Sequence, residues 1–516
     1  MSPLAARSFD RLMTLGDVAE GLRRNLRGHL AAVALVLAAE SAVLWFTQSP
    51  GMLAYALIAL GTWIALAVWS GRGIGLPMLP VFVLQHFATF ALPIIVDHEV
   101  LRTYAPEVLT RAGVEVLVFS LSLTLSWRIF MATLVPGSAY SHALQGFQKD
   151  DLPRLSQLGF MLVAASTAFQ LIQATELNSL IYSALPLGSY PIVNAVSSGV
   201  GTCGFFLISM LVGPGDLAPE RQALFWLLLA VNCLMIAAGF LLSAAAITVG
   251  AVFIGLLWST GRIPWKFLIV IMLLFGYFNL GKFVMRERYW QAEEGAARAQ
   301  LPLGRLPAVY LEWTQASWDI ITGTADPDAA QRQKKSADST KSGQSLLDRI
   351  NNLQNLLYVI DAMDNGHMTP LHGETYALIP PLLVPRIFWN DKPRAHEGQV
   401  ILNVHFGRQD LTSTYETYIA WGLLAEAYGN FGALSGPIIL GVFLGWLCAW
   451  LEIFTVRKLV LSLEGFICFT VFLCVINSYE MVASVLVTST FQAIIPIWLT
   501  CLPFVEKQRL RRPNEP

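Results

Sequence analysis

Three cationic side chains lie close together in the stretch PRIFWNDKPRAHEGQ, residues 385 to 399. They are Arg386, Lys392 and Arg394, and the apolar run ALIPPLLVP precedes them. Arginine binds phosphate oxygens in a planar fork and stays charged at any biological pH, while lysine adds a point charge. Cations beside an apolar surface predict a ligand with an anionic head and a lipid tail.

The same stretch also has a structural interpretation. Pro385 and Pro393 would fix the backbone of a rigid surface turn, and Trp389 would sit at a membrane–water interface. The position of the stretch in a long polar segment favours the functional interpretation. Arg349 and Arg408, in the same segment, are then candidate second contacts with the anionic head.

One carboxylate stands where burial is costly. Glu426 lies in the apolar stretch AWGLLAEAYGNFG, where an unpaired carboxylate needs a partner or a task. The structural alternative is a Glu426 carboxylate that hydrogen-bonds into a neighbouring helix.

The elements that must position these residues are helices in a membrane. The chain has 516 residues, of which 55% are hydrophobic and only 13% charged, against roughly 25% charged in an average soluble domain. Apolar runs long enough to cross about 30 Å of hydrocarbon recur along it. We predict an all-α, polytopic membrane helix bundle of about 12 transmembrane helices, with one large periplasmic loop region that contains short helices. The predicted spans are residues 29 to 47, 52 to 70, 76 to 96, 113 to 134, 156 to 173, 190 to 212, 222 to 241, 243 to 260, 265 to 281, 430 to 454, 463 to 479 and 482 to 504.

Loop charges predict the orientation of these spans. The Arg-rich N-terminus and alternate loops carry most of the flanking Arg and Lys, which favours their placement on the inside. Both termini are then cytoplasmic, and the polar segment 282 to 417 is periplasmic if the membrane is a bacterial inner membrane. The predicted domains are a cytoplasmic segment 1 to 28, a bundle of about nine helices 29 to 281, the periplasmic region 282 to 417, C-terminal transmembrane helices 418 to 504 and a cytoplasmic tail 505 to 516.

The periplasmic region divides by composition. Residues 323 to 344 are small, polar and charged, which predicts disorder. Residues 345 to 366 have apolar side chains at helical spacing and a terminal Asn-Gly, which predicts an amphipathic helix that lies on the bilayer or caps the bundle.

Several chemistries lack their motifs. The six cysteines fall inside apolar runs without a CxxC pair, so neither a disulfide nor a metal site is predicted. No phosphate-binding GxxxxGK[ST] loop, HExxH or GxSxG motif is present. The net charge of −1 gives no global field for nucleic acid. We expect no metal, no cofactor and no nucleic-acid partner.

Three segments resemble a known family. DRINNLQNLLYVIDAM, HGETYALIPPLLVPRIFWNDKP and TYETYIAWGLLAEAYGNFGALSG are similar to segments of the bacterial O-antigen polymerase-like oligosaccharide repeat-unit polymerases. Members show a Pro-Arg and a Trp followed by Lys-Pro, and later a GE.Y.NFG..G element. The resemblance covers roughly residues 345 to 445, and Ala425 stands where a glycine is common.

The resemblance implies a membrane glycosyltransferase that polymerises polysaccharide repeat units at the periplasmic face. Such an enzyme moves a growing glycan from undecaprenyl diphosphate onto an undecaprenyl-diphosphate-linked oligosaccharide, in O-antigen, capsule or exopolysaccharide synthesis. Arg386, Lys392 and Arg394 would then stabilise the leaving diphosphate. The candidate bases for the attacking sugar hydroxyl would be Glu426, Glu397 and His405, in that order, because burial at the membrane edge would raise the pKa of Glu426 towards a useful value. A chain-length regulator and a flippase of the same pathway would be partners, besides the bilayer.

Three other functions fit parts of the same pattern. A flippase for lipid-linked oligosaccharide predicts cations spread over a central cavity rather than gathered in one outer segment. A glycan ligase shares the chemistry and differs only in its acceptor. A non-catalytic assembly subunit would use the outer segment to bind other envelope proteins.

Overall fold

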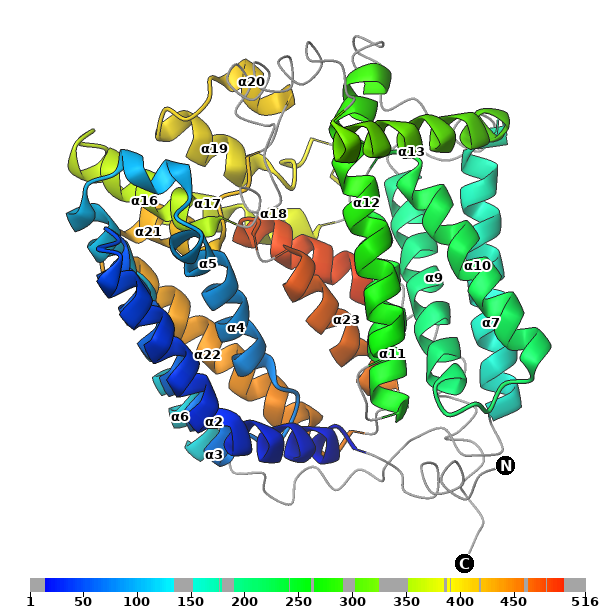
Figure 1. The fold of residues 1–516 in the computed structure, drawn as a ribbon, viewed down its shortest axis with the longest axis horizontal. Coiled ribbons are helices and arrows are strands. Elements are labelled where there is room, and N and C mark those ends of the chain that lie inside the picture. The colour runs from blue at the N-terminus through cyan, green and yellow to red at the C-terminus, as the bar shows by residue number, and fades with distance from the viewer. Residues whose placement is uncertain are drawn as a thin grey trace, which may run out of the picture. The chain divides into compact units, whose positions relative to one another are not determined.

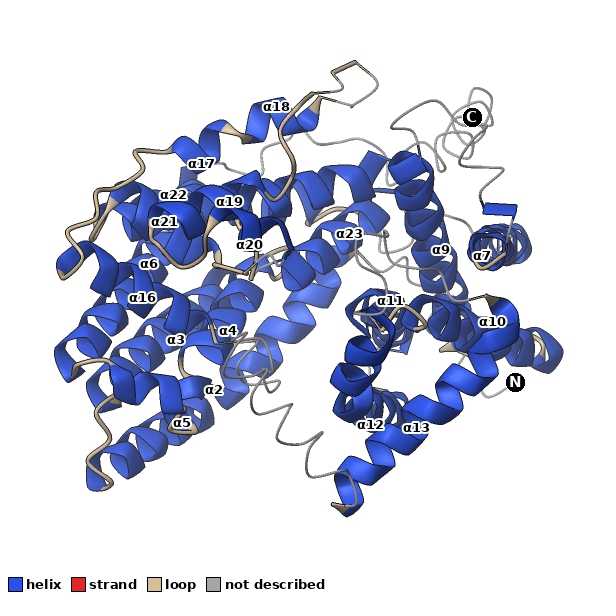
Figure 2. Cartoon of the chain, turned by 90° about the horizontal axis from the view of Figure 1, so that it is seen from above, coloured by secondary structure: helices blue, strands red, loops and turns tan. Residues whose placement is uncertain are grey.

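The computed structural model describes residues 14–133, 152–175, 177–178, 190–240, 242–260, 264–290, 302–323, 351–384, 388–389, 391–416, 419–458, 463–478 and 480–495. Regular structure in these ranges is helical throughout, and Figure 2 shows no strand among them. The predicted all-α class is therefore confirmed. The predicted disorder of residues 323 to 344 falls, apart from Gly323, outside the described residues.

The chain divides into two compact units. One consists of residues 12–146 and 345–494, and the other of residues 147–344 with both chain ends. The predicted periplasmic region 282 to 417 is thus shared between two units, because its first part packs with the preceding helices and its second part with the N-terminal ones. We describe each unit by itself.

The first unit, residues 12–146 and 345–494, holds every candidate site residue that the structure describes. Its long helices are α2 (Leu15–Phe46), α3 (Met52–Arg72), α4 (Met78–Phe90), α6 (Pro106–Thr133), α22 (Ser435–Thr455) and α23 (Leu463–Ser478) (Figure 1). Its short helices are α5 (Leu92–Ile95), η1 (Glu99–Thr103), α16 (Asn352–Asp364), α17 (Glu374–Ala377), α18 (Ile379–Leu383), α19 (Glu397–His405), α20 (Leu411–Glu416), α21 (Leu423–Phe431) and the helix Ala483–Ile495.

Close packing of α6 against α22 organises this unit. A Cβ atom added at Gly441 would lie 2.8 Å from the carbonyl oxygen of Phe119, and one at Gly445 would lie 2.3 Å from that of Leu123. Both distances are too short for a real side chain. The two glycines therefore let the helix backbones approach, as small residues do between membrane helices.

A buried carboxylate fixes one end of the same bundle. Glu452 of α22 is fully buried, and it accepts hydrogen bonds from the indole N–H groups of Trp69 (3.0 Å) and Trp127 (2.7 Å) and from the backbone N–H of Ile74 (2.7 Å). These donors belong to α3, α6 and the turn after α3. One side chain thus joins three segments to α22.

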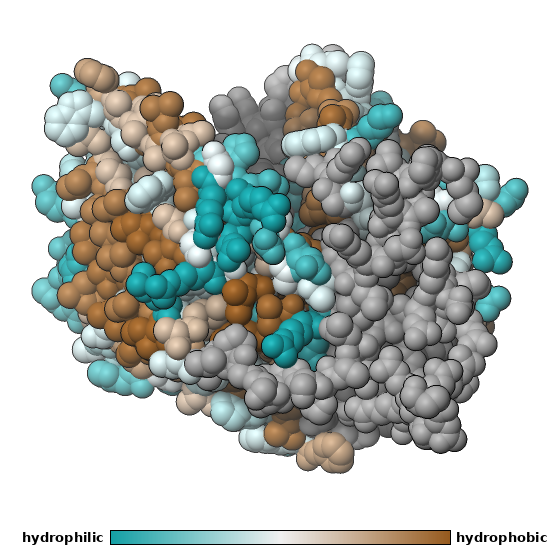
Figure 3. All heavy atoms as spheres, turned by 90° about the horizontal axis from the view of Figure 1, so that it is seen from below, coloured by the Kyte–Doolittle hydropathy of each residue, from teal (hydrophilic) through white to brown (hydrophobic). Residues whose placement is uncertain are grey.

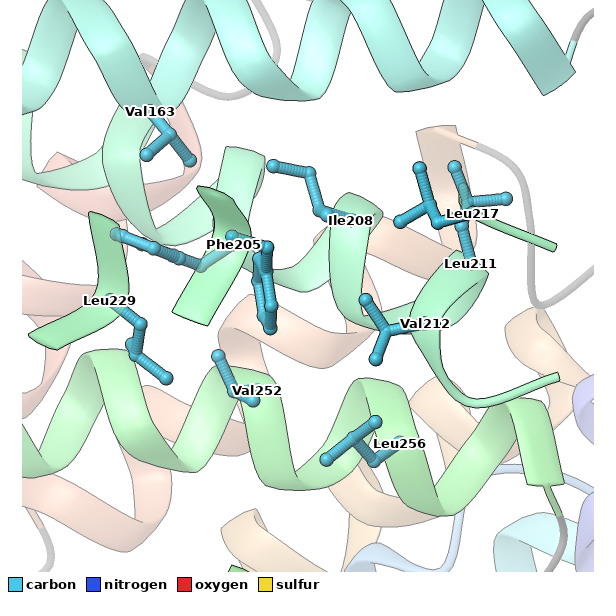
Figure 4. Close-up of a cluster of buried hydrophobic side chains, with 10 residues drawn as sticks. Val163, Phe205, Ile208, Leu211, Val212, Leu217, Leu229, Val252 and Leu256 are labelled. Carbon is cyan, nitrogen blue, oxygen red and sulfur yellow. The ribbon is translucent and has the colours of Figure 1, made fainter. Parts of the chain in front are cut away.

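The second unit packs its helices around apolar side chains. Its elements are α7 (Leu152–Gln173), α9 (Tyr190–Val212), α10 (Pro219–Ala237), α11 (Leu242–Thr260), α12 (Trp265–Trp290), η4 (Leu303–Arg305) and α13 (Leu306–Thr322). Figure 4 shows one cluster, in which Val163, Phe205, Val252 and Leu229 come from four different helices. Trp313 of α13 lies in a second cluster, with Phe240 and Met285.

Two elements of this unit go beyond the sequence prediction. The ninth apolar segment is predicted to end at residue 281, but α12 continues to Trp290, and α13 follows within the predicted periplasmic region. The extension is stabilised by Arg286, which donates to the carbonyl of Phe240, and by Arg288, which pairs with Glu312 of α13.

Helices of membrane-spanning character occur in both units. Seven helices of the described residues are long and apolar enough to cross a membrane, namely Leu15–Phe46, Met52–Arg72, Met78–Ile95, Pro106–Thr133, Pro219–Ala237, Trp265–Lys282 and Ser435–Thr455. All of these overlap predicted spans, although the first begins at Leu15, within the segment 1 to 28 that was predicted to precede it. The space-filling view shows broad apolar areas on the described surface, separated by hydrophilic patches (Figure 3).

The other five predicted spans are also helical where they are described. In three of them the apolar helix is short: Val196–Val212, Ala245–Leu257 and Ala483–Ile495. A helix needs about 20 apolar residues to cross a bilayer. A count of twelve spans and the periplasmic placement of one segment therefore stay predictions.

The amphipathic helix expected over residues 345 to 366 forms as α16 over its described part, Asn352–Asp364. Leu353, Leu356, Leu357, Val359 and Ile360 are buried, and α16 packs against α21, α6 and α4. Of the two predicted positions, the helix adopts the one that caps the bundle.

Candidate functional site

Glycines bracket the central helix of the candidate site. Gly422 precedes α21 with φ +76°, and Gly432 follows it with φ +80°. Side chains rarely adopt such backbone angles, so both turns require glycine. Every residue of α21 from Leu423 to Asn430 is buried. The helix is therefore an internal support rather than a surface element.

Glu426, on α21, is fully buried in a hydrogen-bonded network. One carboxylate oxygen accepts from the hydroxyl of Thr375 at 2.7 Å, and the other accepts from the backbone N–H of Ala483 at 2.6 Å. Asn430 donates to the Thr375 hydroxyl oxygen at 2.9 Å. The side chain thus joins α21 to α17 and to the start of the helix Ala483–Ile495.

Burial sets the protonation of this network. It raises the pKa of Glu426 to about 7, although the hydrogen bonds from Ala483 and Thr375 oppose the shift. The hydroxyl of Tyr376 is buried without a hydrogen-bond partner in the structure. Burial and the nearby Glu426 carboxylate raise the pKa of Tyr376 well above its usual value, so the phenol stays neutral.

The network extends to the predicted cation segment through two consecutive residues. The backbone N–H of Ala483 donates to the Glu426 carboxylate, and the hydroxyl of Ser484 donates to the carbonyl of Ala395 at 3.1 Å. Ala395 lies directly after Arg394 and two residues before Glu397. A buried framework therefore fixes the backbone that carries an exposed guanidinium and a partly exposed carboxylate at the start of α19.

Glu397 and His405 are both partly exposed, whereas Glu426 is fully buried. The side chain of Glu397 accepts no hydrogen bond from the described residues, whereas both oxygens of Glu426 are occupied and shielded from solvent. His405 donates from Nε2 to the carbonyl of Thr369 at 2.8 Å, which leaves only Nδ1 as an acceptor. A base must reach its substrate, so accessibility ranks Glu397 above Glu426, the reverse of the order expected from the sequence.

Lys392 is engaged with the backbone of a neighbouring helix. Its ammonium group donates to the carbonyls of Leu382 (2.9 Å) and Val384 (2.6 Å), at the C-terminal end of α18. A cation at that position complements the partial negative charge of the helix end. Two of its three N–H bonds are therefore used locally, and its predicted role towards a diphosphate stays a prediction.

Arg408 is partly buried and follows the other end of α19. Its guanidinium donates to Asn355 at 2.8 Å and lies 5.3 Å from the ring centroids of both Tyr358 and Trp421. No carboxylate of the described residues pairs with it. Burial lowers the pKa of Arg408, yet arginine keeps its charge in proteins.

The two remaining predicted cations, Arg349 and Arg386, lie outside the described residues. Among the described residues, no three His, Cys, Asp or Glu side chains are grouped as a metal ion would require.

Several residues that contact these groups were not identified from the sequence. Thr375 and Ser484 are common residue types, and no sequence pattern distinguishes them. The asparagines Asn351, Asn352 and Asn355 could have been identified, since they interrupt an otherwise apolar helix pattern. Buried polar residues of this kind need partners, and that rule identifies them.

Comparison with protein-family models, with curated proteins and with solved structures finds no match to this chain. What is established is an all-helical protein with seven described helices capable of crossing a membrane. Any function rests on the residues themselves.

Proposed function

We propose that the chain is a membrane glycosyltransferase of a bacterial inner membrane, which polymerises lipid-linked oligosaccharide repeat units at the periplasmic face. The observation that carries the proposal is the start of α19. There a buried framework built on Glu426 holds Arg394 and Glu397 three residues apart, one a cation and the other an accessible carboxylate. Transfer from a lipid diphosphate needs both kinds of group.

The reaction is a substitution at an anomeric carbon. A hydroxyl of the acceptor oligosaccharide attacks that carbon of the donor glycan, a new C–O bond forms, and the bond to the undecaprenyl diphosphate breaks. The diphosphate leaves with the bonding electron pair, and the hydroxyl proton passes to a base. The bond that breaks supplies the activation, so no nucleotide sugar enters the reaction.

Each group at the start of α19 has a task in this step. Arg394 stabilises the charge that grows on the leaving diphosphate, as positioned cationic donors do for transferring phosphoryl groups. Lys392 and Arg386 belong to the same sequence segment and add positive charge to it. Glu397 accepts the hydroxyl proton. The first N–H groups of α19 add favourable potential for an anion.

Glu426 has a positioning role in this proposal. Its two hydrogen bonds hold α17 and the helix Ala483–Ile495 against α21, and Ser484 carries that order to Ala395. Loss of Glu426 would displace the backbone beneath Arg394 and Glu397, rather than remove a reacting group.

Reconstituted protein in liposomes tests the proposal. It receives only lipid-linked repeat units, and the products are sized by gel electrophoresis and mass spectrometry. We expect products of two or more units on one lipid. A flippase would move the lipids across the bilayer without changing their size, and a ligase would elongate only when another acceptor is added. Products of one unit, with protein shown to be folded, would reject the polymerase.

A further inference from the structure

A second polar centre lies at the opposite end of α19 from Glu397. Helix α19 has nine residues, so its first and last Cα atoms are about 12 Å apart along the axis. Arg408 follows its C-terminal end, and three asparagines, Asn352, Asn355 and Asn403, contact the segment Ala420 to Gly422. Arg394 and this centre therefore lie at opposite ends of one helix.

Three buried carboxamide groups in this centre have N–H donors without acceptors. The side-chain nitrogens of Asn351, Asn352 and Asn403 are buried and make no hydrogen bond in the structure. These residues are only 3%, 2% and 0% exposed, respectively. A buried donor without an acceptor is costly, so a ligand that brings acceptors to these nitrogens would be stabilised there.

The orientation of two of these amides is fixed by their oxygen atoms. The oxygen of Asn351 accepts from the backbone N–H of Gln354 at 2.9 Å as the N-cap of α16, and that of Asn403 accepts from the indole N–H of Trp421 at 2.8 Å. Rotating either amide would place a donor against a donor. Their nitrogen atoms therefore remain the groups that need acceptors.

Contacts through Ala420 to Gly422 join these amides to Arg408. Asn355, which accepts from Arg408, donates to the carbonyl of Ala420 at 3.0 Å. The amide of Asn352 contacts Gly422, where a Cβ would approach it to 3.1 Å. The centre also contains the start of α16, whose first N–H groups favour anions.

Donors outnumber acceptors in this centre. Among the described residues, three amide nitrogens and a guanidinium that pairs with no carboxylate stand against one buried oxygen without a donor, that of Gln409. A group that only accepts hydrogen bonds and carries negative charge complements such a set, and a phosphate has both properties. Arg408 would pair with the negative charge of the phosphate, and the neutral amides would donate hydrogen bonds to its oxygens.

We propose that Arg408, Asn351, Asn352 and Asn403 form an oxyanion site that binds the diphosphate of the acceptor lipid, separate from the diphosphate that leaves. The assignment to the acceptor rests on the proposed function. The hydroxyl that attacks lies at the far end of an oligosaccharide from its own diphosphate, so the acceptor's anion must bind away from Glu397. A site at the other end of α19 meets that requirement.

Binding of inorganic pyrophosphate tests the site without any reaction. The variant Asn351→Asp keeps an N-cap that serves a helix equally well but replaces the free amide with a carboxylate. By calorimetry in detergent, we expect two pyrophosphate sites in the native protein, and we expect the variant to weaken the one that does not contain Arg394 by about tenfold or more, as loss of a hydrogen bond to a charged group does. Asn365→Asp, which places the same charge on the exposed end of α16, is the matched control and should stay within about twofold.

Asn403→Asp is a second variant, and it retains the acceptor for Trp421. Equal pyrophosphate binding by the native protein and by both variants, or no binding by the native protein, would overturn the oxyanion site even if elongation is observed.

A polymerase assay then determines which lipid places its diphosphate in the site. Asn351→Asp should slow transfer to a lipid-linked acceptor but leave transfer to the free oligosaccharide unchanged. Equal slowing with both acceptors would place the donor's diphosphate there instead.

Discussion

The hydroxyl of Thr375 donates to a carboxylate oxygen of Glu426 at 2.7 Å, and both side chains are fully buried. Because Thr375 also accepts from Asn430, it is the shared member of the network. We expect Thr375→Val, which has the same shape without a hydroxyl, to lower the free energy of unfolding by about 1–3 kcal/mol. Thr375→Ser should stay close to the native value in detergent denaturation, and equal losses in both would refute the assigned bond.

Burial of Glu426 predicts a pH dependence of stability. The folded-state pKa is about 7, against a usual value of 4.5, so the folded protein retains a proton that the unfolded chain releases over this range. Stability should therefore fall as the pH rises from 4.5 to 7, by roughly 3 kcal/mol from this group. Glu426→Gln should flatten that part of the profile measured by thermal unfolding. A variant profile as steep as the native one would contradict the assignment.

Glu397 is expected to act in the reaction rather than in the fold. Glu397→Gln should lower the rate of elongation by roughly 10²–10⁴-fold, the usual contribution of a general base, with little change in melting temperature. Glu374 is also the first residue of its helix and is exposed, which makes Glu374→Gln a matched control. Full activity of the Glu397 variant would remove it from the mechanism.

The Glu452 clamp predicts a large effect on stability. Glu452→Ala would leave the indole N–H groups of Trp69 and Trp127 buried without acceptors. We expect unfolding to become easier by roughly 3 kcal/mol or more, since each unsatisfied buried donor costs about 1–3 kcal/mol. Cys448→Ala, at a buried position one turn earlier on α22, should cost less. Similar melting temperatures for the two variants would show that the clamp does not support the bundle.

Much of the helical organisation could be predicted from apolar runs and flanking charge, because the bilayer restricts segment length. The prediction was weaker outside those runs. It missed α13, whose Trp313 packs in a core, because a polar composition around it concealed a short helix with one apolar face.

The sequence predicted individual residues of the candidate site but not their partners. Glu426 was predicted because burying a carboxylate is costly, and it is buried. Its partners are 51 and 57 residues away, and one of them is a backbone N–H, which no residue pattern reveals. For Lys392 the residue type favoured an anionic ligand, but local geometry directs it to carbonyls eight and ten residues earlier.

The most direct measurement of the central claim is the stoichiometry of the transfer. Purified protein in liposomes receives lipid-linked repeat units, and free undecaprenyl diphosphate is quantified against new glycosidic bonds. The proposed reaction predicts one diphosphate lipid released for each bond formed, and loss of both in Glu397→Gln. Folded protein that forms no bond and releases no diphosphate lipid, whether or not it moves its substrate across the bilayer, would contradict it.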